Sequence, residues 1–131
     1  MQARNTLTIA ALAGFLGVAL GAFGAHGLKA IVPPDLMTVY QTGVQYHLVH
    51  AVVLLGLGVW QLHGNSVWLQ RSAVLFVAGL LLFSGSLYLL AITGIRPLGM
   101  ITPLGGTAWL VAWWCLLMAA RQQANTPKNL S

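Results

Sequence analysis

Acidic side chains are almost absent from this sequence, and their scarcity limits what the protein can be. Asp35 is the only Asp or Glu among 131 residues, against six Lys or Arg, and charged residues make up 5% of the chain. This small number of polar residues cannot cover the surface of a soluble domain. Lipid must therefore replace water over most of the surface. Proton and cation pumps usually carry an acid within the membrane. Asp35 lies outside the long uncharged segments, which disfavours classical coupled transport.

Cysteine is equally scarce, which excludes further kinds of site. Cys115 is the only cysteine and lies in an apolar segment, so no internal disulfide can form, and such a residue typically acts as a small buried side chain. The CxxCH motif that attaches haem is missing as well. The net charge of +5 lies outside the apolar segments, and membrane topology explains it better than a nucleic-acid partner does.

Apolar residues, by contrast, make up 58% of the chain and gather in four long uncharged segments. Each is much longer than the roughly 10 alternating residues of a barrel strand, and a helix of about 20 residues spans the hydrocarbon layer. Because backbone groups in lipid must pair internally, helices are favoured. We therefore predict an all-α fold, an integral membrane four-helix bundle formed by a single domain over 1–131, with helices at 5–25, 41–62, 72–94 and 103–120 and a frayed tail at 121–131.

Proline marks two of the connections between these helices. The Pro-Pro pair at 33–34 ends any helix that arrives from the first segment. Asp35 then suits the first turn of the next helix, where its charge meets the positive end of the helix dipole, and this helix continues to Leu62. Thr102 before Pro103 is typical of an N-cap followed by proline at the first helical position.

The basic residues predict the orientation in the membrane. In the four-helix scheme they divide unequally between the two sides, and the side with more Lys and Arg tends to face the cytoplasm. We expect a multi-pass protein of the bacterial inner membrane, surrounded by the lipid bilayer, with both termini in the cytoplasm. The division is Arg4, Arg71, Arg121 and Lys128 on one side against Lys29 and Arg96 on the other.

Small residues form stripes on the first and last predicted helices. At about 100° per residue, the members of each stripe lie on one side of their helix. Such stripes let helices approach one another closely. We predict that they pack helices within the bundle or against another subunit, with Gly14, Gly17, Gly21 and Gly24 in the first stripe and Gly105, Ala108 and Ala112 in the last.

The second predicted helix carries the most polar stripe in the membrane. His47 and His50 share one face, and Tyr46 lies one turn before His50. Ionisable residues at such depth usually face the bundle interior or a wet cavity. His26, at the end of the first helix, would reach the same membrane side through a short loop. The candidate polar pocket therefore consists of His26, Gln41, Tyr46, His47, His50, Ser84 and Tyr88.

Two interpretations of these histidines remain open. Neutral imidazoles could hydrogen-bond a carbonyl, a tyrosine or water, or they could contact a lipid headgroup, a quinone, haem or a metal ion. His-x-x-His spacing alone is a weak signal, and no carboxylate in the bundle can orient the rings, so we assign neither a metal site nor a cofactor. Ser84 and Ser86 do not specify a serine nucleophile, and no catalytic residue is predicted.

Four separated motifs carry a resemblance to a known family. They are GAFGAH at 21–26, QTG at 41–43 followed by Tyr46 and His50, FSGSLY at 83–88, and TPLGG at 102–106. Together, and in this order, they resemble the YgdD-like family of small bacterial inner-membrane proteins, a domain of unknown function. The resemblance implies four membrane helices and no assigned activity. It also implies that Gln can replace His47, which places His26 and His50 ahead of His47 as candidate ligand residues.

Three functional hypotheses follow. The first is a non-enzymatic membrane component that packs helices or a partner subunit, as an accessory or scaffold part of a homo-oligomer or a larger complex. The second is a binding module whose polar pocket holds a lipid, quinone, haem or metal. The third, suggested by size and membrane class alone, is a small oligomeric channel or transporter.

Overall fold

The computed structural model describes residues 1–127, and within them every regular element is helical. Four spans are long and apolar enough to cross a membrane, which confirms the predicted all-α fold with four candidate membrane helices. The elements are α1 (Ala3–His26), η1 (a 3-10 turn, Leu28–Ala30), α2 (Pro34–Leu62), α3 (Val67–Gly79), η2 (a π-helical segment, Leu80–Ser84), α4 (Gly85–Thr93), η3 (a 3-10 turn, Arg96–Met100) and α5 (Thr102–Asn125).

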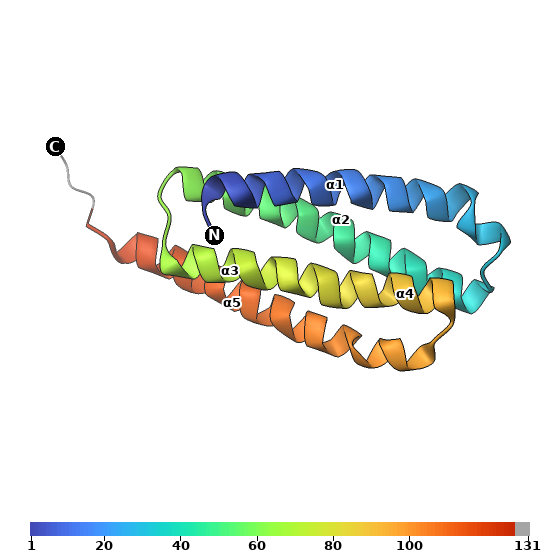
Figure 1. Cartoon of the computed structure of the whole chain (residues 1–131). Helices are drawn as coiled ribbons and strands as arrows, with labels where there is room; N and C mark the ends of the chain where they lie inside the picture. Colours follow the sequence, from blue (N-terminus) through green and yellow to red (C-terminus); the bar gives the residue numbers. More distant parts are fainter. Residues whose placement is uncertain (128–131) are drawn as a thin grey trace.

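The spans run up and down as two hairpins, α1 with α2 and α3–η2–α4 with α5 (Figure 1). The N-terminus and the last turns of α5 lie at one end of the bundle, while η1 and η3 lie at the other (Figure 1). α2 packs along α1 on one side and along η2 and α4 on the other, and α5 packs on α3 and η2. α2 and α3–η2–α4 are thus the central pair, flanked by α1 and α5.

Two helices begin well before their sequence-based boundaries, and a third lacks its predicted cap. α2 begins at Pro34, not 41, and holds Asp35 in its first turn as expected. α3 begins at Val67 instead of 72 because the Ser66 hydroxyl caps it, accepting the Leu69 N–H at 3.2 Å. α5 starts near its predicted position, but Thr102 does not cap it.

The prediction of a frayed tail is wrong for residues 121–125. α5 continues as a helix from the predicted end at 120 to Asn125. The Gln123 side chain accepts a hydrogen bond from the Trp60 indole N–H at 3.0 Å, which ties this polar extension to the end of α2. Residues 128–131 of the predicted tail lie outside the described residues.

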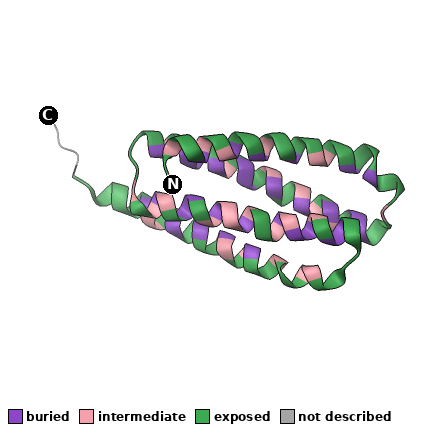
Figure 2. Cartoon of the chain, in the orientation of Figure 1, coloured by how far each residue is buried: buried purple, intermediate pink, exposed green. Residues whose placement is uncertain are grey.

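The buried faces of the helices point inward, while their outer faces are exposed along their whole length (Figure 2). Many of the exposed side chains are large and apolar, such as Phe15 at 72% and Leu110 at 73% exposure. Water would oppose this arrangement, whereas lipid tails solvate it. The main core lies where all four spans meet and consists of Ala10, Leu54, Leu57, Ala73, Phe76, Trp109 and Ala112.

The two small-residue stripes lie mostly inside the bundle. A side chain at Gly17, Gly21 or Gly24 would meet α2, and one at Gly105 would meet the backbone of η2. Ala112 is fully buried and Ala108 is half-buried on α5. Gly14 differs, because a Cβ there would meet nothing within 4 Å. The stripe on α1 is therefore divided between an inward-facing set and one outward-facing glycine.

Candidate functional site

A buried histidine links three helices in the middle of the bundle. The His47 side chain on α2 has its Nε2 2.7 Å from the Ala13 carbonyl of α1 and its Nδ1 2.8 Å from the Tyr88 hydroxyl of α4. A carbonyl can only accept, so Nε2 carries the proton and Nδ1 accepts from the tyrosine. This assigns a neutral imidazole whose two nitrogens are both occupied.

Glycines make room for these contacts. A Cβ on Gly17 would lie 3.2 Å from His47 Cδ2, so a larger residue there would push the ring away from α1. A Cβ on Gly43 would lie 3.0 Å from the Tyr88 ring, and the Gly43 carbonyl accepts the Ser84 hydroxyl at 2.8 Å. Close approach of the backbones thus positions His47, Tyr88 and Ser84 together.

Ser84 ends the π-helical segment η2, which widens the third span by one residue. The Gly85 N–H bonds to the Leu80 carbonyl five residues back, where an α-helix would use four. The wide turn lies against α5, where Gly105 lets the backbones touch. Such insertions often occur at functional sites, and here the insertion turns Ser84 toward α2.

A cavity of about 250 Å³ opens beside this polar cluster, between α1 and α3–η2–α4. His47, Ser84 and Tyr88 contribute to its wall, and the other lining residues are apolar or small, among them Leu12, Leu16 and Leu81. The polar atoms of the three side chains bond to one another or to backbone carbonyls. The cavity therefore offers a ligand few hydrogen bonds and suits an apolar one.

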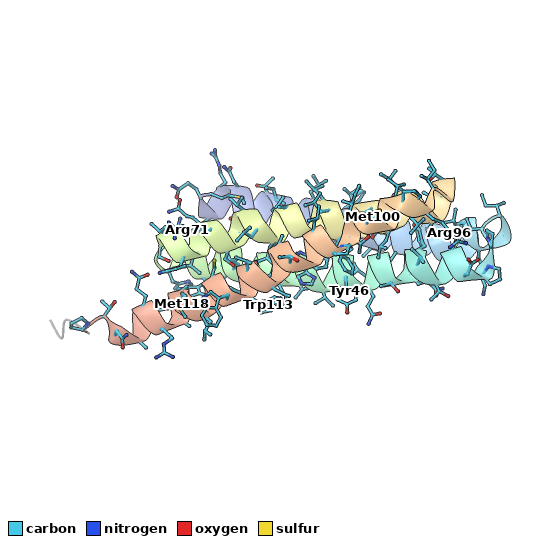
Figure 3. The ribbon with its side chains drawn as sticks, turned by 90° about the horizontal axis from the view of Figure 1, so that it is seen from below. Tyr46, Arg71, Arg96, Met100, Trp113 and Met118 are labelled. Carbon is cyan, nitrogen blue, oxygen red and sulfur yellow. The ribbon has the colours of Figure 1, made fainter. Side chains whose placement is uncertain are left out.

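The second membrane histidine, His50, takes part in a separate aromatic cluster. Its ring stacks on Trp109 of α5, with centroids 3.7 Å apart and planes 3° from parallel. Tyr46 stacks on the same indole at 5.9 Å, and Trp113 meets Phe76 edge-on. Tyr46 and Trp113 of this region are labelled in the view from below (Figure 3). We call Tyr46, His50, Trp109 and Trp113 the aromatic face.

The two ring nitrogens of His50 differ in their hydrogen bonding. Nδ1 lies 2.8 Å from the Tyr46 carbonyl one turn back, so it carries the proton. Among the described residues, neither Nε2 of His50 nor the hydroxyl of Tyr46 has a protein partner. Tyr46 is 44% exposed and His50 is 5% exposed. The acceptor, His50 Nε2, therefore lies at the edge of the core, and the donor, the Tyr46 hydroxyl, lies at the surface.

The seven residues of the candidate polar pocket do not form one site. His47, Ser84 and Tyr88 lie together, and Tyr46 and His50 belong to the aromatic face. His26 and Gln41 are both exposed near the η1 end. The three predicted histidines therefore do not converge, because His47 contacts α1 and α4 while His50 contacts α5. Within residues 1–127 no three His, Cys, Asp or Glu side chains could hold a metal ion.

Comparison with known proteins assigns the chain to a family. Residues 20–106 match the family described as "Protein of unknown function (DUF423)". The chain is 42% identical over 120 residues to the UPF0382 inner membrane protein YgdD of Escherichia coli, covering 92% of each chain. It is 43% identical over 118 residues to the UPF0382 membrane protein YwdK of Bacillus subtilis, covering 87% of this chain and 94% of the relative.

The chain belongs to the UPF0382 family, also described as DUF423. The resemblance inferred from the four motifs is confirmed, as is a membrane protein without an assigned activity. Its inner-membrane location agrees with the four candidate spans and with the name of the Escherichia coli relative. No solved structure matches the chain. The DUF423 match begins within α1 and ends within α5, so it includes His47, His50 and Tyr88.

Two residues of this UPF0382 protein have structural roles that sequence reasoning missed. Tyr40 is 1% exposed, packs over Gly24, and donates its hydroxyl to the Leu20 carbonyl of α1. Trp109 is 4% exposed, covers Gly79, and donates its indole N–H to the Phe76 carbonyl at 3.1 Å. A glycine facing a large aromatic residue on another helix was the available signal, but the pairing requires the fold.

Proposed function

We propose that this UPF0382 protein is a non-enzymatic, multi-pass component of the bacterial cytoplasmic membrane that acts through its packed helices, as an accessory or scaffold subunit. Its single membrane domain would cover residues 1–131. The observation that carries this proposal is that, within residues 1–127, the buried serines and His47 hold helices together through hydrogen bonds and are not arranged as a nucleophile beside a free base.

Four interhelical hydrogen bonds illustrate this use. His47 reaches Ala13, Ser84 reaches Gly43, Ser72 reaches the Ala112 carbonyl at 2.9 Å, and Trp109 reaches Phe76. Each ends on a backbone carbonyl of another span, as polar residues commonly do in membrane bundles. A nucleophilic mechanism would require a serine beside a free base. Ser72 and Ser84 each donate to a carbonyl instead, so this geometry supports a packing role.

The orientation forms part of the proposal. Arg4, Arg71 and Arg121 belong to the end that holds the N-terminus and the last turns of α5 (Figure 1), while Lys29 and Arg96 belong to the end formed by η1 and η3. Lys128 lies outside the described residues. By the positive-inside rule, the end with more arginine faces the cytoplasm.

Reporter fusions test this orientation. We expect a fluorescent protein that matures only in the cytoplasm to be active when fused after Ser131, and an alkaline phosphatase that matures only in the periplasm to be active when inserted after Ile31 in the η1 loop. The reverse pattern would overturn the orientation without affecting the packing argument.

A native-membrane experiment tests the scaffold proposal itself. The outer groove between α1 and α2, of about 430 Å³, includes Gly14 and Val52. A Cβ at Gly14 meets nothing within 4 Å, so Gly14→Leu would extend into this groove, and Gly56→Leu is a matched control because a Cβ there also meets nothing within 4 Å. We expect native mass spectrometry to detect a second protein subunit or copy, reduced by Gly14→Leu only. A bare monomer for the parent and both variants would overturn the proposal.

The aromatic face supports a second candidate, a binding module for a quinone or quinol. A quinol hydroxyl could donate to Nε2 of His50, a quinone oxygen could accept from the Tyr46 hydroxyl, and the exposed ring of Trp113 offers a stacking surface. A short-chain quinone should then quench tryptophan fluorescence saturably. His50→Phe keeps an aromatic ring but removes the acceptor, so it should weaken binding more than Val49→Ala does. Equal quenching in both variants would remove this candidate.

A further inference from the structure

We propose that the groove between α3 and α5 binds one anionic phospholipid, with the phosphate on Arg71 and an acyl chain along the apolar wall. This binding site is independent of the scaffold role proposed above. It lies at the end of the bundle where α3 begins, and Figure 3 places Arg71 at that end, opposite Arg96. The argument rests on the shape of the groove, the position of the charge, and the absence of an acidic partner.

The groove has the size and lining that a lipid chain requires. Its volume is about 670 Å³, within the roughly 300–1,000 Å³ range of ligand sites. Arg71, Gln70 and Trp68 lie in the first turns of α3, so they form the polar end of the groove. From there the wall is apolar and includes Val74, Leu75, Val111 and Trp114.

Within residues 1–127, Arg71 has no acidic partner. Asp35 is the only Asp or Glu in the sequence, and its carboxylate pairs with Arg96 at 3.1 Å at the opposite end of the bundle. Within the described residues, Arg71 takes part in no salt bridge. An arginine at the membrane interface without a protein carboxylate is suited to a lipid phosphate, which its planar guanidinium can bind through two parallel hydrogen bonds.

Trp68 holds this guanidinium beside the groove. Arg71 Cζ lies 5.4 Å from the centroid of the Trp68 ring, within the range of a cation–π contact. Tryptophan is enriched at the level of lipid headgroups, so the pair is expected at the depth of the phosphates. The stacked ring restricts the arginine side chain, which reduces the conformational entropy lost on binding.

Three other hollows of the described residues lack this combination. The outer groove between α1 and α2 and the cavity beside His47 are lined by apolar or uncharged residues, so they suit lipid tails of any kind. A fourth hollow at the terminal end of the bundle, lined in part by Trp60 and Gln123, is more polar and has no arginine in its wall. Only the groove at Arg71, among those four, joins a cation to a long apolar wall, which favours an anionic phospholipid over a zwitterionic one.

Native mass spectrometry of the full chain in detergent tests the proposal. The probes are phosphatidylglycerol and phosphatidylcholine with identical acyl chains, added separately. We expect one phosphatidylglycerol to bind in preference to phosphatidylcholine. Arg71→Gln should weaken this binding roughly tenfold, because a hydrogen bond to a charged group is lost. Val111→Trp, which fills the apolar wall, should weaken it as well.

Arg4→Gln is the matched control, since it removes one positive charge from the same end of the bundle but from outside the groove. It should leave phosphatidylglycerol binding within about twofold of the parent, because exposed charges away from the site are screened by salt. Equal losses in Arg4→Gln and Arg71→Gln would overturn the site in favour of a diffuse electrostatic attraction. Displacement of the lipid by millimolar inorganic phosphate would also overturn it, because the acyl chain would then contribute nothing.

Discussion

Substitution of Gly105 by alanine is the sharpest test of the packing scheme. Gly105 on α5 lies against the backbone of η2, and a Cβ built on it would be 2.8 Å from both the Leu82 carbonyl carbon and the Phe83 Cα. Favourable carbon–carbon contacts begin at about 3.5 Å. Because these atoms belong to the backbone, no side-chain rotation can relieve the overlap. We expect α5 to shift away from η2.

The magnitude follows from two opposing effects. Overpacking of a close contact costs about 1–3 kcal/mol. Replacing glycine by alanine within a helix contributes up to about 1 kcal/mol in the other direction. A matched glycine is needed to separate them, and the next residue supplies it, since a Cβ on Gly106 would have its nearest neighbour at 3.9 Å, an ordinary contact. The difference between Gly105→Ala and Gly106→Ala should therefore be about 1–3 kcal/mol.

Unfolding of the full-length protein in mild detergent, by titration with SDS, measures this difference. Circular dichroism reports helix loss, and the summed fluorescence of the five tryptophans, Trp109 among them, reports loss of tertiary packing. We expect Gly106→Ala to unfold at or above the SDS concentration of the parent and Gly105→Ala clearly below it. If the two variants unfold together, the close approach of α5 to η2 is refuted.

Three further results are expected. His47→Leu should destabilise the protein by about 1–3 kcal/mol in the same titration, since it removes two hydrogen bonds, and Tyr88→Phe should cost less because it removes one; equal costs would contradict the bridging role. Asp35→Asn should leave the midpoint unchanged, because its pair with Arg96 is exposed, and a large shift would contradict this. Cys115, which is 4% exposed, should react slowly with a polar maleimide in mild detergent and rapidly in SDS; fast labelling of the folded protein would contradict its burial.

Helix ends show where local sequence information is sufficient and where it is not. Asp35 at the start of α2 followed from the proline pair, because proline restricts the backbone whatever its surroundings. Thr102 carried the same kind of local signal and yet does not cap α5. Its hydroxyl instead lies 2.6 Å from the Ser86 hydroxyl of α4. The partner comes from another span, so no local pattern could indicate the outcome.

The histidines show the same limit at the candidate site. Resemblance to the family placed His26 and His50 ahead of His47, yet His26 is exposed at the end of α1 and His47 bridges α1 and α4. His47 and His50 are close on a helical projection, which led to their assignment to one pocket. A difference of about 60° in direction is enough to send one side chain to α1 and the other to α5.

By itself, the sequence determined that this is a four-span helical membrane protein of the UPF0382 family, with two of its connections near prolines. These properties depend on the length and hydropathy of local segments. A segment of about 20 apolar residues crosses the hydrocarbon core when it forms a helix, so the segments can be assigned as membrane helices without knowledge of their neighbours. Only the tertiary structure decided that Ser84 ends a π-helical turn, that His47 and His50 face different helices, and that Arg71 lies at the head of an apolar groove. Those properties depend on which helices are neighbours and on how closely their glycines let them approach.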